Sequence, residues 1–375
     1  MIYRIPSIDE INAFAGSNGL NVISTFAGCG GSSTGYKMAG FKVLLACEFI
    51  AEAVKTYKEN APSTPVCDLD IREVSGDQLL QMAGIGVGEL DVLDGSPPCS
   101  AFSMAGLRND GWGVEKQYSG TTSQRVDDLF FEFARLVGEI QPKVFVAENV
   151  TGLVSGTAKG YFKEIFHALQ AATPGYRVAA QVLDSSKLGV PQIRRRLIFI
   201  GVREDIGRDP AFPTPLPFRI PLRLAIGDLP EPDRSDYDFL KPGTRTRMAY
   251  DYTDVIRDGG CFRYAYQRLY GIDARYNWFK LNPSKPCPTL TAKVNTFFRW
   301  DAPRSLSIQE GLRIQSFPDD FKLTGSRRQR WERIGRAVPP LMMGHVAKTV
   351  AEKIFDVERD TLVDQVIRGL EDDGS

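Results

Sequence analysis

The sequence contains little histidine and lacks any paired-cysteine motif. Its 375 residues include only two histidines, His167 and His345, and six cysteines that occur singly. Because no two cysteines have the CxxC spacing, we expect no zinc site or other metal site. The first ten residues, MIYRIPSIDE, do not resemble a secretory signal. Scattered thiols in such a chain predict a reducing cytoplasm.

Net charge and long apolar runs are also missing. Lysine plus arginine and aspartate plus glutamate both number 46, and no apolar run is long enough to span a bilayer. We therefore expect no membrane partner. The charge balance excludes an extended basic arm but leaves room for a locally basic groove. Hydrophobic residues make up 43% of the chain, which is typical of a globular protein with one large domain or two ordinary ones.

The stretch Asp91–Ser103, DVLDGSPPCSAFS, is the most informative. Its first four residues predict a short buried strand, and Gly95 with the two following prolines predicts a rigid turn. Cys99 then lies just beyond the carboxyl end of a strand, where open α/β sheets bind ligands. It is a candidate nucleophile, and the alternative is a small buried thiol. Residues Ser103–Gly113 are the candidate closing loop.

A glycine-rich turn follows the first expected strand. Residues 21–24 predict this strand, and 32–39 predict a helix after the sequence TFAGCGG. Glycines let the backbone approach a ligand, and a helix N-terminus offers free N–H groups. The next strand, 41–47, ends at Glu48, where an acid would hold ribose hydroxyls. The pattern fits a nucleoside cofactor without pyrophosphate at least as well as it fits NAD.

A carboxylate and two arginines complete the candidate site. Residues 142–147 predict a buried strand that ends at Glu148, on the same sheet edge as Cys99. The alternative for Glu148 is a helix cap or a solvated loop acid. Arg194 and Arg196 share side-chain parity in an extended segment, which suggests phosphate or base contacts. Their alternative is a solvated sheet edge.

Alternating strands and helices predict an α/β fold with a second, smaller domain. We expect a catalytic and cofactor-binding domain over 1–204, with its third strand at 66–71. Residues 205–315 are rich in proline and interleave basic with aromatic residues, as a nucleic-acid groove would. We expect these residues to form the second domain. The end of the chain, 316–375, is predicted to return to helices.

Six sequence blocks together resemble the C5-cytosine DNA methyltransferases. They are FAGCGG, GSPPCSAFS, ENV at 148–150, Gln192-x-Arg194-x-Arg196, RSLSIQEGLRIQSFPDDF and IGRAVPP. They occur in the family's order and at similar spacing, and the resemblance covers nearly all the chain except the proline-rich middle. It implies a Rossmann-like, S-adenosylmethionine-dependent domain with a mostly parallel sheet whose last strand is antiparallel. It also implies a small target-recognition domain and a C-terminal segment, 316–375, that folds back onto the large domain. Duplex DNA as partner, a monomer, and a cytoplasmic, nucleoid-associated location are expected as well.

The resemblance also implies roles for particular residues. Cys99 would attack C6 of cytosine, and Glu148 would be held against N3 and the exocyclic amine. Arg194 and Arg196 would bind the target nucleotide. The residues that would line the cofactor are Phe26, Gly28, Gly30, Glu48, Asp70, Ile71, Pro98, Leu129, Arg336 and Val338.

Arg336 departs from the family pattern, which has asparagine there. A guanidinium ~4 Å from the cofactor's sulfonium would be repelled by about 4 kcal/mol at an effective dielectric of ~20. Arg336 would then point outward to phosphate or an acid, weaken cofactor binding, or select a carboxylated S-adenosylmethionine. Two further hypotheses remain open from the sequence: the same chemistry on tRNA, and a non-catalytic DNA-binding paralogue.

Overall fold

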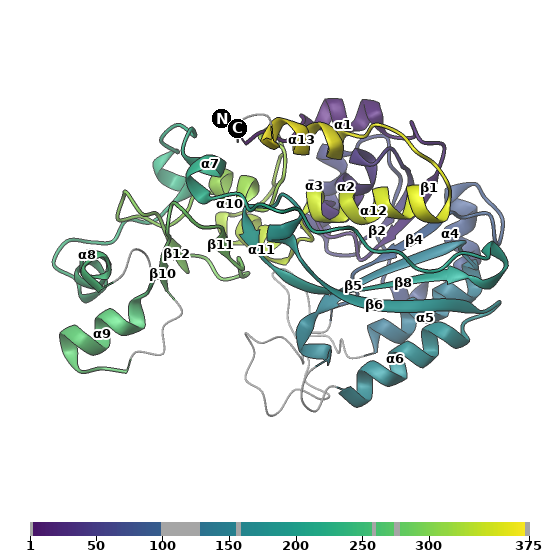
Figure 1. The fold of residues 1–375 in the computed structure, drawn as a ribbon, viewed down its shortest axis with the longest axis horizontal. Helices are drawn as coiled ribbons and strands as arrows, with labels where there is room; N and C mark the ends of the chain where they lie inside the picture. Colours follow the sequence, from purple (N-terminus) through teal and green to yellow (C-terminus); the bar gives the residue numbers. More distant parts are fainter. Residues whose placement is uncertain (1–2, 99–127, 155–158, 257–259, 274–277, 372–375) are drawn as a thin grey trace.

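A seven-stranded sheet forms the centre of the larger lobe (Figure 1). The structure is a computed structural model that describes residues 3–98, 128–154, 159–256, 260–273 and 278–371. The strand order is β3-β2-β1-β4-β5-β8-β6. The strands are β1 (Asn21–Thr25), β2 (Lys42–Cys47), β3 (Val66–Cys67), β4 (Val92–Gly95), β5 (Val144–Val150), β6 (Tyr176–Asp184) and β8 (Arg195–Arg203).

The sheet is parallel except at β8. That strand pairs antiparallel with β5 on one side and with β6 on the other. The remaining neighbours, from β3 to β5, run parallel. This arrangement confirms the predicted Rossmann-like α/β class with one antiparallel strand. The chain order reverses between β1 and β4, and ligands of open α/β sheets bind at such a switch point.

Helices cover both faces of the sheet (Figure 1). One face carries α1 (Ile8–Phe14), α2 (Gly31–Met38), α3 (Ala51–Asn60), α12 (Pro340–Ile354) and α13 (Leu362–Glu371). The other carries α4 (Gly76–Ala83), α5 (Leu129–Ile140) and α6 (Lys159–Ala171). Strand residues alternate between two apolar cores: Val22 belongs to the α2 side and Ile23 to the α5 side. This period-two alternation gives the sheet two buried faces.

A smaller lobe lies at the left of Figure 1. Its sheet has the order β12-β10-β9 and its own small core around Tyr250 and Phe262. Its elements are α8 (Arg245–Ile256), β9 (Gly260–Cys261), α9 (Phe262–Tyr270), β10 (Phe279–Lys280) and β12 (Phe297–Phe298). Where the lobes meet lie β11 (Cys287–Pro288), α10 (Ile308–Ile314) and α11 (Arg327–Arg336). Strand β7 (Gln192–Ile193) pairs with β11, and α7 (Leu222–Ile226) contacts α10. The domain boundaries at 204/205 and 315/316 stay predictions.

The third strand is shorter than predicted. The sequence favoured a strand over 66–71, but β3 ends at Cys67. Asp70 instead caps a 3₁₀ turn, Ile71–Glu73, and its carboxylate accepts a hydrogen bond from the Arg72 backbone N–H. Aspartate competes for backbone donors in this way and so ends extended structure. Within the described ranges, no helix could cross a bilayer and no side-chain cluster could hold a metal.

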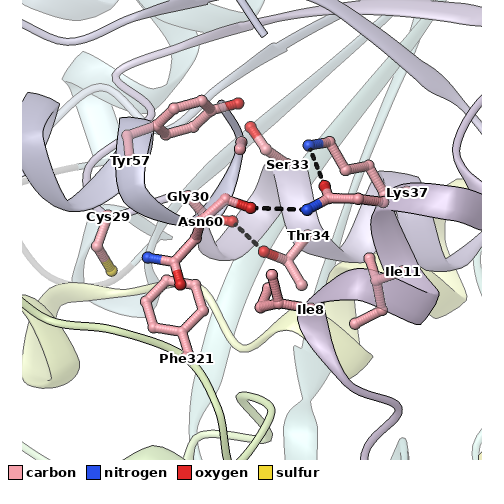
Figure 2. Close-up of a pocket in the computed structure, with 12 residues that line it drawn as sticks. Ile8, Ile11, Cys29, Gly30, Ser33, Thr34, Lys37, Tyr57, Asn60 and Phe321 are labelled. Atoms are coloured by element: carbon pink, nitrogen blue, oxygen red, sulfur yellow. Dashed lines mark hydrogen bonds between the residues drawn. The ribbon is translucent and has the colours of Figure 1, made fainter. Parts of the chain in front are cut away.

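Lys37 is an unusual buried cation on α2. Its side chain is only slightly exposed, and its ammonium donates a hydrogen bond to Asn12 Oδ1 at 2.8 Å (Figure 2). Burial lowers the pKa of Lys37 to about 8. Because the folded-state value lies below the unfolded value of about 10.4, the charged form is costly in the folded protein. The full cost is present below pH 8 and disappears as pH rises toward the unfolded pKa.

We predict that Lys37→Met stabilises the protein at pH 7 by roughly 1–3 kcal/mol, after allowing for the lost hydrogen bond. Wild type should gain stability between about pH 8 and 10.4, whereas the variant should not. Urea unfolding across this range measures both effects. Lys42→Met, at an exposed position, is the control. A variant less stable than wild type at pH 7 would contradict the prediction.

Candidate active site

One large cavity lies at the carboxyl ends of the central strands. Its volume is about 1190 Å³, above the roughly 300–1,000 Å³ of ordinary small-molecule sites. It therefore has room for a cofactor and a second ligand. Its walls include the loop after β1, the Ser96–Pro98 turn, the end of β5, the start of β8 and the segment after α11. The predicted site residues that line it are Phe26, Gly28, Glu48, Asp70, Ile71, Pro98, Leu129, Glu148, Arg194, Arg196, Arg336 and Val338.

Glu48 organises the loop after β1. One carboxylate oxygen accepts a hydrogen bond from the Gly28 backbone N–H and the other from that of Ile50, both at 2.8 Å. Burial raises the pKa of Glu48, and these backbone donors oppose that effect. Phe26 and Gly28 both have positive φ, 52° and 57°, so the loop turns sharply toward the cavity. A carboxylate that faces the cavity here suits the two hydroxyls of a ribose.

The neighbouring wall combines apolar and acidic groups. Ile71 and Leu129 are buried side chains that line the cavity. Arg72 bridges Asp70, at 3.2 Å, and Asp128, at 2.8 Å, so the acidic edge is held in place. A flat apolar wall beside carboxylates fits the base and ribose of a nucleoside. The residues present therefore fit the nucleoside part of S-adenosylmethionine, and the role of Glu48 as ribose contact stays a prediction.

Gly31 allows the C-terminal segment to approach α2 closely. A Cβ at Gly31 would lie 2.2 Å from the Val338 carbonyl oxygen, and one at Gly35 would lie 2.4 Å from that of Pro340. Only glycine permits such contacts. Gly30, by contrast, lines a separate cavity of about 10 Å³, enough for one water molecule (Figure 2). The structure does not bring Gly30 to the large cavity.

Glu148 and Arg196 form an ion pair on the catalytic wall. Arg196 Nε lies 2.7 Å from Glu148 Oε1, and both side chains are largely buried. The antiparallel register places Glu148 opposite Ile198 and Val150 opposite Arg196, so the two charged side chains share one face. Next to Glu148, Asn149 Nδ2 donates to the Pro97 carbonyl at 3.2 Å. The end of β5 thus holds the turn that leads to Cys99, which lies outside the described residues, as does the expected closing loop.

Arg194 contacts the scaffold. It is 2% exposed, and its guanidinium donates to the carbonyls of Leu290, Gly335 and Arg336 at 3.1–3.3 Å. Burial, with Arg196 nearby, holds its pKa well below the usual arginine value. Arg194 therefore ties β8 to two segments far away in sequence. Direct contact with a nucleotide stays a prediction for this residue.

Two glutamines, for which the sequence predicted no role, connect the same distant segments. Gln192 Nε2 donates to Gln315 Oε1 at 2.9 Å, and Gln192 Oε1 accepts from the Leu290 N–H at 2.9 Å. Gln315 Nε2 in turn donates to the Ile334 carbonyl at 2.5 Å. Gln192 belongs to the Gln192-x-Arg194-x-Arg196 block and shares the side-chain parity of Arg194. Gln315 lies within the block RSLSIQEGLRIQSFPDDF, but its partners are far away along the chain and no local pattern identifies them.

Arg336 pairs with an acid on its own helix. Its Nε donates to Glu332 Oε1 at 3.0 Å, one helical turn earlier, and its side chain is 48% exposed. Of the three expected outcomes for Arg336, this geometry matches the one in which the guanidinium meets an acid.

Residues 20–352 match the family model of the C-5 cytosine-specific DNA methylases. The chain belongs to this family. It is 32% identical over 340 residues to the Type II methyltransferase M1.HphI of Haemophilus parahaemolyticus, covering 88% of this chain and 86% of that protein. It is 31% identical over 388 residues to the Type II methyltransferase M.DdeI of Desulfomicrobium norvegicum, covering 89% and 88%. The prediction of a DNA cytosine-5-methyltransferase is confirmed, and its family implies S-adenosylmethionine as cofactor.

Solved structures share the fold. A putative DNA modification methyltransferase encoded within an E. coli prophage has a TM-score of 0.66 at 23% identity, with 90% of this chain and 99% of that chain covered. A Spodoptera frugiperda DNMT2 mutant has a TM-score of 0.60 at 16% identity, with 88% and 99% covered. At these identities the likeness supports the fold alone.

We predict that Gly31→Ala separates α2 from Val338. The variant should lose roughly 2–4 kcal/mol of stability and bind S-adenosylmethionine at least tenfold more weakly, because the added methyl group forces backbone apart. Urea unfolding and calorimetric titration with the cofactor measure these effects. Gly160→Ala in α6, where an added Cβ meets nothing within 4 Å, is the control and should change neither. Equal cofactor affinity in both variants would contradict the prediction.

Proposed function

We propose that the enzyme methylates C5 of a cytosine flipped out of sequence-specific duplex DNA, through a covalent bond between Cys99 and C6. The observation that carries this proposal is the Glu148–Arg196 pair, which lies in the same cavity as Glu48 and the glycine loop. Pro98, immediately before Cys99, lines that cavity too. The carboxylate and the arginine therefore lie in one cavity with Pro98, the residue that precedes Cys99 in the sequence.

The chemistry requires a thiolate because C5 of cytosine is a poor nucleophile. Addition of Cys99 Sγ to C6 forms an S–C bond and gives C5 enamine character. When bound, the cofactor would supply a methyl group on a sulfonium, whose sulfur would keep the electron pair of the broken S–C bond and leave as a neutral thioether. After C5 gains that methyl group, a base removes the C5 proton, and the electron pair expels Cys99 as thiolate. A free cysteine has a pKa of about 8.5, so nearby cationic groups favour the attacking form.

Glu148 is proposed to hold a proton at N3 of the target base. Charge develops at N3 when the thiolate adds, and a proton on the glutamate would neutralise it. Arg196 fixes the direction of this side chain through the 2.7 Å contact. Both arginines line the cavity, but the guanidinium of Arg194 is engaged by the carbonyls of Gly335 and Arg336. We propose Arg196 as the nucleotide contact and Arg194 as the support for its strand.

Base flipping is proposed because C5 and C6 are stacked inside a duplex. Extrusion of a base costs a few kcal/mol, which contacts in the pocket offset. The smaller lobe would supply the second wall of the DNA cleft: Trp278, Phe279 and Lys293 already line the cavity. A single active site serves one flipped base, so we propose a monomer. The same chemistry on tRNA and a non-catalytic paralogue are the competing outcomes of the assay below.

We predict that the protein adds one methyl group to cytosine in unmethylated duplex plasmid DNA. Cys99→Ala should abolish the product, and Glu148→Gln should lower the rate by 10²–10⁴-fold because the proton at N3 is lost. Mass spectrometry of the digested nucleosides measures both. Lys42→Met is the matched control. Product on tRNA but not on the duplex would move the chemistry to RNA, and binding without product would indicate the non-catalytic paralogue.

A second prediction concerns Arg336. Because this guanidinium pairs with Glu332, the wild-type product should be 5-methylcytosine even when S-adenosylmethionine and its carboxylated analogue compete. Arg336→Asn should leave that preference unchanged and alter the rate by less than about threefold, since exposed ion pairs contribute little. A carboxymethyl product from the wild type that disappears in the variant would show instead that Arg336 selects the cofactor.

A further inference from the structure

We propose that Arg333 on α11 binds the carboxylate in the methionine part of S-adenosylmethionine and selects this cofactor over its decarboxylated form. The carboxylate meant here is the one beside the amino group, not an additional group on the transferred carbon. This role rests on the use of S-adenosylmethionine, which the family implies, and not on the covalent step proposed for Cys99. The sequence alone predicted no role for Arg333.

One side of α11 lines the large cavity. Gln329, Glu332, Arg333 and Arg336 are all part of the cavity wall. Because they are three, four and seven residues apart, they lie on the same side of the helix. Ile334, in contrast, is buried in the core of the larger lobe. The helix therefore places four polar residues at the cavity and its apolar side against the protein.

Three of these four side chains have partners that account for them. Gln329 Oε1 caps the first turn of α11 by accepting a backbone N–H at 3.0 Å. Glu332 and Arg336 form an ion pair with each other at 3.0 Å. Arg333 donates from Nη2 to the Thr324 carbonyl, but its Nε and Nη1 have no acceptor among the described residues. Since a guanidinium carries five N–H donors, most of its binding capacity is unused.

Arg333 also lacks a counter-ion within the part of the chain that the structure describes. The other arginines of the cavity wall are engaged: an acid lies near each of Arg72, Arg195, Arg196 and Arg336, and backbone carbonyls hold Arg194. Arg333 is half-buried, so water compensates its charge only in part. A bound anion would remove the cost of this unpaired cation.

The guanidinium lies beside the loop after β1. Burial raises the pKa of Cys29 to about 12, and the nearby charge of Arg333 opposes that effect. Burial also raises the pKa of Glu48, and Arg333 is among the groups that oppose it. Cys29 and Glu48 both line the cavity, as do Gly31 and Ser32 at the start of α2. The N-terminus of this helix adds to the positive potential beside Arg333.

The charges of the cofactor match this arrangement. S-adenosylmethionine carries a sulfonium, an amino group and one anionic group, the carboxylate. Glu48 and Asp70 suit the hydroxyls of the ribose, whereas the corner at Arg333 suits an anion. Burial lowers the pKa of Arg333, but a guanidinium stays protonated in proteins. The decarboxylated form would leave Arg333 unpaired beside two further positive charges, so it should bind more weakly.

The test is calorimetric titration of the free protein with S-adenosylmethionine and with its decarboxylated form. In the wild type, the dissociation constant of the decarboxylated form should be larger by at least about thirtyfold. In Arg333→Gln this ratio should fall by about tenfold, because the pairing that distinguishes the two ligands is removed. Arg328→Gln removes an exposed arginine from the same helix, away from the cavity, and should keep the wild-type ratio.

Two further variants keep a binding role separate from a structural one. Arg333→Lys retains the charge and should retain more of the ratio than the glutamine variant does. A role confined to the Thr324 carbonyl would instead weaken both ligands equally and leave the ratio unchanged. Arg333→Met replaces the glutamine variant if that protein does not fold, as judged by thermal unfolding without ligand.

The remaining outcomes distinguish this role from the use of the cofactor. A wild type that binds both ligands equally, or an Arg333→Gln protein with the wild-type ratio, overturns the role of Arg333. Weaker binding of duplex DNA with an unchanged ratio would assign the guanidinium to a phosphate and overturn it as well. A wild type that binds neither ligand would overturn the use of S-adenosylmethionine itself.

Discussion

The close contact between α2 and the segment after α11 is the constraint on which the site depends. Gly31 and Gly35 leave no room for a side chain between α2 and the carbonyls of Val338 and Pro340. This contact brings residues more than 300 positions apart to one cavity. The loop after β1 forms one wall, and the C-terminal segment that carries Arg336 and Val338 forms another. The return of the chain to α2 therefore completes the cavity that would hold the cofactor.

Buried polar groups form a second set of contacts between segments that are far apart in the sequence. Arg194 and Gln192 hold the segments around Leu290, Gln315 and Gly335 against β8. Because these donors are surrounded by protein, losing one partner leaves a buried polar group without a hydrogen bond. The free-energy cost of that unpaired group exceeds the net stabilisation that the hydrogen bond contributes. The strand that carries Arg196 is thereby fixed. Through its ion pair with Arg196, the side chain of Glu148 on the neighbouring strand is held in place as well.

Much of the fold could be predicted from local patterns, and the long-range contacts could not. Apolar strands and the acids at their ends placed Glu48 and Glu148 at one sheet edge, because parallel strands end together. Strand β3 was predicted too long because Asp70 caps a turn whose geometry depends on Arg72 and Asp128. The scaffold contacts of Arg194 and the place of Arg333 beside the loop after β1 depend on pairings across the chain that no short window contains.

Catalysis is proposed to depend on a covalent bond between the target base and Cys99, which follows in sequence the segment held by the Asn149–Pro97 hydrogen bond. The most direct measurement is peptide mapping by mass spectrometry after incubation with S-adenosylmethionine and duplex DNA that contains 5-fluorocytosine. Fluorine at C5 blocks the elimination step, so the adduct should persist. We expect a nucleotide attached to the peptide that contains Cys99. Methylated DNA from the normal substrate, together with no adduct or an adduct at another residue, would contradict it.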